Sequence, residues 1–82
     1  MIKKAEILSK EVEVCQWTGH NADEMIAFAG KAVHDIYKNS YGFCCWIYTI
    51  RLAAGDYVVK ANNKVIEVCS EDNFKERYRF IE

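Results

Sequence analysis

Cysteine and histidine are the residues of this chain best suited to chemistry, but their spacing argues against catalysis and metal binding. The residues concerned are Cys15, Cys44, Cys45, Cys69, His20 and His34. Zinc sites usually draw their ligands from two close pairs, whereas Cys44 and Cys45 point to opposite faces of a predicted strand. A nucleophilic thiol needs a positioned base, and neither histidine stands at a suggestive spacing. We expect small apolar strand residues, no metal, no cofactor and no enzymatic activity.

Two short polar segments are candidate ligand-binding loops. Thr18-Gly19-His20-Asn21 precedes a predicted helix, where free amides and the helix dipole can hold an anion. The segment has one glycine and no lysine or arginine, so a simple helix cap is the favoured interpretation. Gly55-Asp56 is predicted to be a tight turn that the Asp56 carboxylate fixes by bonding nearby backbone. The alternative interpretation places that carboxylate at the edge of a pocket.

Aromatic side chains form the third group of candidates. Trp17, Trp46, Tyr41, Tyr48 and Tyr57 exceed what one small sheet face hides, although core packing can account for most of them. Beside Arg51, such rings suit a protein interface or a stacking platform for a base or nucleotide. The candidate binding residues are therefore Trp17, Thr18, His20, Asn21, Trp46, Tyr48, Arg51, Asp56 and Tyr57.

Composition and charge narrow the class of partner. The 82 residues are 51% hydrophobic and 28% charged, which is typical of one folded domain over residues 1–82. Eleven basic and twelve acidic residues give a net charge of -1, which disfavours both a nucleic-acid partner and DNA mimicry. The apolar stretch 41–50 is too short to span a membrane, and no apolar signal segment follows the first charges. We expect a cytoplasmic protein with reduced thiols and no membrane partner.

Hydrophobic periodicity predicts the elements that must position these residues. Residues 11–17 alternate with a period of two, which indicates a half-buried strand, and residues 1–10 are an edge strand or a loose lead-in. A short helix should begin at Asn21, with Glu24 completing a capping box, and should end before Gly30. Further strands are expected at 32–37, 43–52 (the longest), 57–60 and 65–68, with a turn at Asn62-Asn63 and a helix over 71–79 capped by Ser70. The expected class is α+β, a single small domain with a mostly antiparallel sheet of about four or five strands, one short helix after the first main strand and a C-terminal helix.

Several of these segments together resemble small, uncharacterised phage and prophage proteins. The resemblance rests on Val14-Cys15-Gln16-Trp17-Thr18-Gly19, Phe28-Ala29-Gly30, Gly55-Asp56-Tyr57-Val58-Val59-Lys60, the strand that ends at Cys69, and Phe74 with Tyr78 four residues later. It spans residues 12–78, although Ala54 and Ala61 replace the proline and glycine of that pattern and 33–49 matches no motif. It implies a phage-derived gene and a compact α+β fold, and it brings no catalytic residues.

Two functional hypotheses follow from these observations. The first is a non-enzymatic phage or prophage accessory protein that binds a protein partner and associates with itself. A chain this short buries only about 60% of the surface that its unfolded form exposes, and a second copy is the simplest source of further burial. The second is a counter-defence protein that binds a small ligand, a nucleotide signal, in a pocket between protomers, with residues 18–21 and the surplus aromatics as its motivating features.

Overall fold

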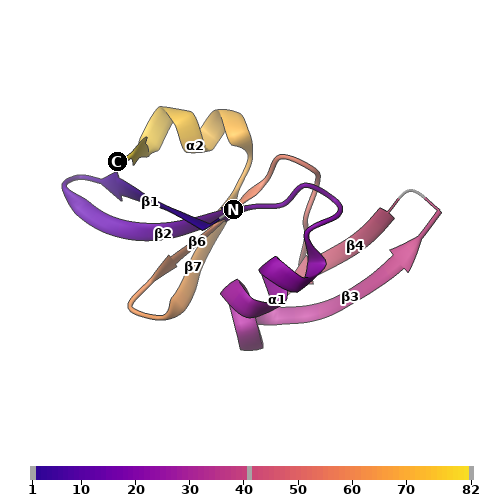
Figure 1. The fold of residues 1–82 in the computed structure, drawn as a ribbon. Helices are drawn as coiled ribbons and strands as arrows, with labels where there is room; N and C mark the ends of the chain where they lie inside the picture. The colour runs from indigo at the N-terminus through magenta and orange to yellow at the C-terminus, as the bar shows by residue number, and fades with distance from the viewer. Residues whose placement is uncertain (1, 41, 82) are drawn as a thin grey trace.

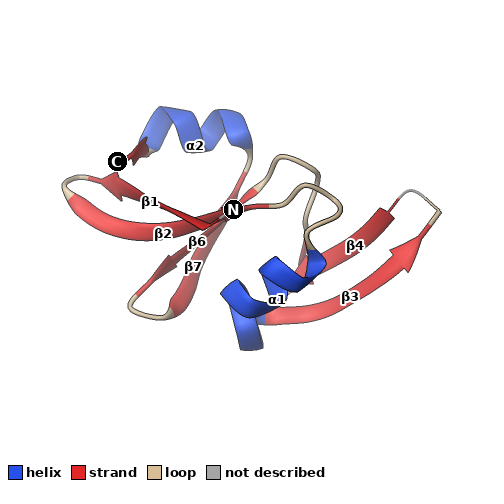
Figure 2. Ribbon diagram, viewed as in Figure 1, coloured by secondary structure: helices blue, strands red, loops and turns tan. Residues whose placement is uncertain are grey.

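Two antiparallel sheets and two helices make up the chain (Figures 1 and 2), in a computed structural model that describes residues 2–40 and 42–81. The expected α+β class is confirmed. In chain order the elements are β1 (Ile2–Ile7), β2 (Lys10–Gln16), α1 (Ala22–Ala29), the 3₁₀ turn η1 (Gly30–Ala32), β3 (Val33–Asn39), β4 (Gly42–Ile47), β5 (Ile50–Arg51), β6 (Tyr57–Ala61), β7 (Lys64–Cys69), α2 (Glu71–Arg77) and β8 (Arg79–Phe80). Tyr41 lies outside the described residues.

The larger sheet has five strands in the order β7-β6-β2-β1-β8, and all its neighbours are antiparallel. The alternation of β2 divides its side chains between two hydrophobic clusters, as its sequence predicts. Val12 and Val14 belong to the cluster that includes the buried ring of α2, whereas Cys15 and Trp17 belong to the cluster that includes α1. α2 therefore packs on one face of the sheet, and α1 lies on part of the other (Figure 2), where Glu11 and Glu13 of β2 stay exposed.

Aromatic stacking holds α2 on its face of the sheet. The Phe74 ring lies between those of Tyr57 and Tyr78, with centroid separations of 4.1 and 4.9 Å. The Ser70 hydroxyl accepts a hydrogen bond from the Asn73 amide, which confirms the predicted cap. The helix ends at Arg77, two residues before the predicted end, because the next residues extend and pair with β1 as β8.

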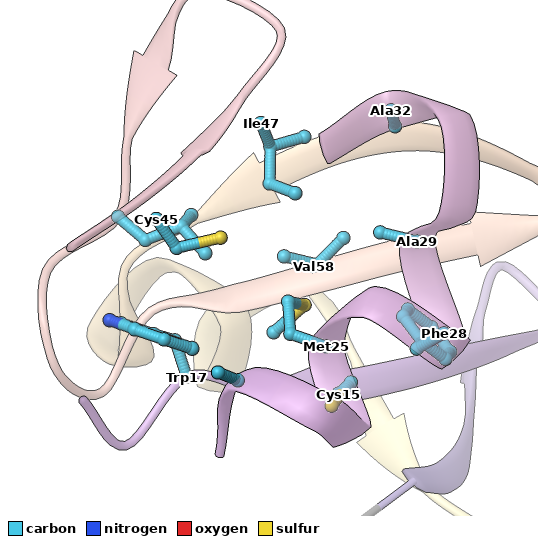
Figure 3. Packing of buried hydrophobic residues seen from close by; sticks show 11 residues of the cluster. Cys15, Trp17, Met25, Phe28, Ala29, Ala32, Cys45, Ile47 and Val58 are labelled. Atoms are coloured by element: carbon cyan, nitrogen blue, oxygen red, sulfur yellow. The ribbon is translucent and has the colours of Figure 1, made fainter. Parts of the chain in front are cut away.

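The smaller sheet has the order β3-β4-β5 and packs against the hydrophobic cluster that includes α1. Figure 3 shows its Cys45 and Ile47 pointing toward Met25 of α1 and Val58 of β6. Val58 and Ile47 are fully buried, so the two sheets and α1 share this core. The sequence predicts one sheet only, and this second sheet is an addition to that prediction.

The second sheet arises because residues 43–52 do not form the single long strand predicted for them. The chain reverses after Ile47, with Tyr48 at φ +53°, and Ile50–Arg51 pairs back onto β4. A single straight strand over these ten residues would be about 33 Å long and would carry Leu52 far from Ile47. The reversal instead returns both Ile47 and Leu52 to the same core cluster.

Two other turns connect strands of the large sheet, and one of them was expected from its residue types. Asn62 and Asn63 both adopt positive φ, 52° and 63°, and form the predicted hairpin turn. The open choice for residues 1–10 resolves as β1, which joins β2 through a turn at Leu8-Ser9 with φ of 50° and 65°. No helix in the described part of the chain is long and apolar enough to cross a membrane.

Candidate functional site

A cleft of about 570 Å³ opens beside β4, where β5 no longer pairs with it. Two backbone hydrogen bonds connect β4 to the segments beside it. The Phe43 amide donates to the Gly19 carbonyl and the Leu52 amide donates to the Cys45 carbonyl, each at 2.9 Å. The volume lies in the range of small-ligand sites. The cleft brings together four of the residues singled out from sequence, namely Trp17, Thr18, His20 and Arg51.

Asn21 organises the loop that forms one wall of the cleft. Its Oδ1 accepts hydrogen bonds from the amide and the hydroxyl of Thr18, at 2.9 and 3.1 Å. Its Nδ2 donates to the Gln16 carbonyl at 2.8 Å and to the Glu24 carboxylate at 2.9 Å. The predicted capping box is therefore wrong in its bonding, because the Asn21 side chain bonds backward into the loop and does not cap α1.

A thiol with two hydrogen-bond donors lies at the base of the cleft. Asn39 Nδ2 is 2.9 Å and Arg51 Nη2 is 3.4 Å from Cys44 Sγ. The Arg51 guanidinium therefore lies beside the Cys44 thiol, at the surface of the second sheet. This arrangement gives the cleft one permanently charged cation, which can pair with an anionic group.

Asp56 is occupied in the turn that forms the opposite wall. Its carboxylate accepts a hydrogen bond from the Ala53 amide at 2.9 Å, and its own amide donates to the Ala53 carbonyl at 3.0 Å. The Gly55 amide and the Asp56 carbonyl both bond to the backbone of Trp17, at 2.7 and 2.8 Å. The structure therefore favours the turn interpretation of Asp56 over a carboxylate free to meet a ligand.

The predicted aromatics divide into core and surface residues. Trp17 is 1% exposed and Tyr57 is 7% exposed, so both rings belong to the core. Tyr57 packs beneath α2, on the face of the large sheet away from α1, and takes no part in the cleft. Trp46 is half-buried and Tyr48 is 53% exposed. Among the candidate aromatic rings, Trp46 and Tyr48 therefore offer surface for contact with a partner.

The outer face of the second sheet gathers the remaining polar and aromatic candidates. Cys45 and Ile47 point into the core, so the alternating residues Cys44 and Trp46 point outward. The cross-strand register places further side chains on the same face, and we define the outer face as Asp35, Tyr37, Asn39, Cys44, Trp46 and Arg51.

Asp35, Tyr37 and Asn39 are absent from the candidates chosen by sequence. The alternation of β3 is weak, and a bulge between Val33 and Asp35 shifts its register. If residues 43–52 form one strand, Arg51 and Trp46 lie on the same strand and cannot pair. The register that places Asp35 opposite Trp46 is likewise not evident from the sequence. Gly42, the first residue of β4, is a local signal of this hairpin.

Cysteine chemistry is suppressed over most of the chain. All four thiols are free and buried. Burial raises the pKa of Cys45 to about 11, and burial together with the nearby Glu24 carboxylate raises the pKa of Cys15 to about 11. Both therefore stay protonated at neutral pH and are poor nucleophiles. Within residues 2–40 and 42–81, no group of three or more histidine, cysteine, aspartate or glutamate side chains is placed to hold a metal ion.

Comparisons with known proteins identify no relative of this chain. No model of a protein family matches the sequence, and neither the curated proteins nor the solved structures that were searched contain a match.

Proposed function

We propose that this chain is a non-enzymatic accessory protein, of phage or prophage origin, that binds another protein through the outer face of its three-stranded sheet and acts in the bacterial cytoplasm. The observation that carries the proposal is the row Asp35, Trp46 and Arg51, in which directly paired residues of three strands share one face. Tryptophan, tyrosine and arginine are the residue types that dominate binding energy at protein interfaces.

The rest of the molecule supports this choice of surface. In the five-stranded sheet α2 packs on one face and α1 covers part of the other, whose remaining surface carries exposed charged residues such as Lys4 and Glu13 and no aromatic ring. The outer face instead carries a half-buried tryptophan and a tyrosine, Tyr37, that is 46% exposed. A large apolar ring held between two opposite charges is an arrangement that a protein partner can cover and pair with.

The proposal that the protein is not an enzyme rests on the state of its reactive groups. The thiols of Cys15 and Cys45 are held protonated by burial, and the Asp56 carboxylate is bonded within its own turn. His20 lies in the cleft with the Cys44 thiol, but this thiol is bonded to Asn39 and Arg51. The Cys15 thiol does donate to the Glu24 carboxylate at 3.6 Å, but this thiol is fully buried and its raised pKa keeps it protonated, which makes it a poor nucleophile.

Affinity capture from a lysate of host bacteria that also express an untagged copy of this chain tests the proposal, with tagged wild-type protein compared with Trp46→Ser and with Ile66→Ser as the matched control. Ile66 is an exposed apolar residue of β7, in the other sheet. We expect a protein, either from the host or a second copy of this chain, to be retained by wild type and Ile66→Ser and lost with Trp46→Ser. Equal retention by all three, or retention of nothing, contradicts the proposal.

A second candidate function is the binding of a small phosphate-bearing ligand, such as a nucleotide, in the cleft. The observation that favours it is the convergence of Arg51, His20 and Thr18 on a volume that suits such a ligand. Thermal-shift measurements with nucleoside triphosphates and cyclic dinucleotides test it. His20→Ala separates the two functions, because it should remove a ligand-induced rise in Tm and leave protein capture unchanged. Absence of any ligand-induced rise in wild type contradicts this second candidate.

A further inference from the structure

The charges of the outer face are arranged so that the face complements a copy of itself. Asp35 lies opposite Trp46 from one side and Arg51 lies opposite it from the other, each in a directly paired register position. The row therefore reads negative, aromatic, positive across the three strands. Neighbouring strands lie about 4.8 Å apart, so the backbones of Asp35 and Arg51 are separated by about 10 Å with the Trp46 side chain between them.

Neither charge of this row is neutralised within the chain. Asp35 and Arg51 are both exposed, and neither forms an ion pair with another residue of 2–40 or 42–81. The Arg51 guanidinium has a single weak acceptor in the described chain, the Cys44 sulfur at 3.4 Å. A guanidinium has five N–H donors in a planar fork that matches a carboxylate. Most of its donors are therefore available to a carboxylate brought by a partner.

We propose that the partner of the outer face is a second copy of this chain, packed face to face about a two-fold axis that runs parallel to β4 at Trp46. This inference rests on the proposed function and names its partner. Rotation about such an axis exchanges the two sides of the sheet, so that Asp35 lies over Arg51 of the second copy and Arg51 lies over its Asp35. The two Trp46 rings meet on the axis. A two-fold interface requires this reciprocity, in which the same residues pair twice.

The same rotation gives Tyr37 a place in the interface. Tyr37 pairs with Cys44 on the side of β4 away from Arg51. Exchange of the two sides carries its ring to the side of Cys44 where the second copy has its cleft, between Arg51 and Ala53. The Tyr37 side chain of one copy, which is 46% exposed in the single chain, thus lies against the cleft of about 570 Å³ in the other copy. The outer face has six side chains, fewer than a permanent interface uses, so the dimer should be weak and concentration-dependent.

Charge reversal with complementation tests this arrangement by sedimentation velocity from about 10 µM to about 1 mM protein. Asp35→Arg places arginine against arginine twice in a homodimer, and Arg51→Asp places aspartate against aspartate twice. Each variant alone should dimerise at least about tenfold more weakly than wild type, since like charges face each other at both symmetric positions. An equimolar mixture of the two variants should regain wild-type dimerisation, because the heterodimer restores both pairs.

Two further variants complete the design. Glu76→Arg reverses an exposed charge on α2, which packs on the large sheet away from the three-stranded one, and should dimerise like wild type. Tyr37→Ala should weaken dimerisation without any change of charge. Circular dichroism of each variant checks that the fold is retained, and the mixture tests the pairing even if one variant is less stable.

Three results would overturn the inference: wild type that stays monomeric over the whole range, single variants that dimerise like wild type, or a mixture that fails to recover. The proposed function is tested separately. If wild type is monomeric but still captures a host protein in a Trp46-dependent way, the outer face is a protein-binding surface for a different partner and only the self-association fails. If capture also fails, the proposed function falls with it.

Discussion

Substitution of Asn21 distinguishes a structural tie within the cleft loop from a helix cap. Asn21→Ala removes four hydrogen bonds, two accepted from Thr18 and two donated to Gln16 and Glu24. An intramolecular hydrogen bond contributes about 0.5–1.5 kcal/mol net, and the two bonds to Thr18 lie at the low end because they are exposed. We therefore expect a loss of about 2–3 kcal/mol in the free energy of unfolding.

Asn21→Asp is the discriminating variant. Aspartate caps helices as effectively as asparagine does. If Asn21 acted as a helix cap, the Asn21→Asp variant would therefore be almost as stable as wild type. In the observed network a carboxylate can still accept from Thr18, but it cannot donate to the Gln16 carbonyl and it places a second negative charge beside Glu24. We expect it to cost at least as much as Asn21→Ala at pH 7.

Urea unfolding followed by circular dichroism measures both variants. With a slope of about 1 kcal/mol per M urea for a chain of this size, the midpoint should fall by about 2–3 M in each case. Lowering the pH through the range where carboxylates protonate should recover part of the loss for Asn21→Asp and none for Asn21→Ala. An Asn21→Asp protein as stable as wild type at pH 7 would refute the bonding described for this loop.

Three other substitutions have defined outcomes. Gly42→Ala should cost about 2–3 kcal/mol in urea unfolding, because Gly42 has φ +127° and a Cβ there would meet the His20 ring at 3.0 Å. Leu8→Asn should raise stability by about 0.5–1 kcal/mol, because Leu8 is 91% exposed and has φ +50° in a two-residue turn; an unchanged or lower Tm would count against this account of the turn. Burial acts to raise the pKa of Glu67, but hydrogen bonds from Tyr78 and a neighbouring arginine outweigh it and leave that pKa lowered. A lowered pKa of Glu67 in the folded state stabilises the protein at pH values above the ordinary glutamate pKa, and this stabilisation is lost as the pH falls through the folded-state pKa. Glu67→Gln removes the titrating group, so the Tm of this variant should fall less steeply with pH on the acid side than that of wild type.

The sequence predicts the fold best where local chemistry decides the structure. Alternation over β2 correctly divides Val14 and Trp17 between two faces, and paired asparagines correctly mark the turn at Asn62-Asn63. The Ser70 cap is likewise a local bond, made within the first turn of α2.

The hairpin of β4 and β5 depends instead on tertiary packing. Tyr48 is a poor residue for positive φ, and no local signal marks the reversal there. The turn forms because it returns Leu52 to the core with Ile47. A prediction that lacks this turn cannot identify the outer face, because Arg51 reaches its place opposite Trp46 and Asp35 only after the chain reverses.

Among the cleft residues, the sequence predicts Thr18 and His20, which share one loop, and Arg51, which is chosen by residue type. It does not predict Asn39 and Cys44, which reach the cleft through the β3–β4 hairpin. Tyr57 was selected because it is aromatic and follows the Gly55 turn, but stacking on Phe74 places it in the core. Residue type alone does not separate a core ring from a contact ring.

The two tryptophans of the chain allow a direct measurement of the central claim, that the outer face binds a second copy of this chain. Their indole N–H groups give separate NMR signals, which can be followed as ¹⁵N-labelled protein is diluted from about 1 mM to about 20 µM. We predict that the Trp46 indole signal and the amide signals of Asp35 and Arg51 shift with concentration, and by more than the indole signal of the buried Trp17. The amide signals of Ile66 in β7 and Glu76 on α2 should stay fixed. Shifts confined to α2, or no shift at any residue of the outer face, would contradict the account.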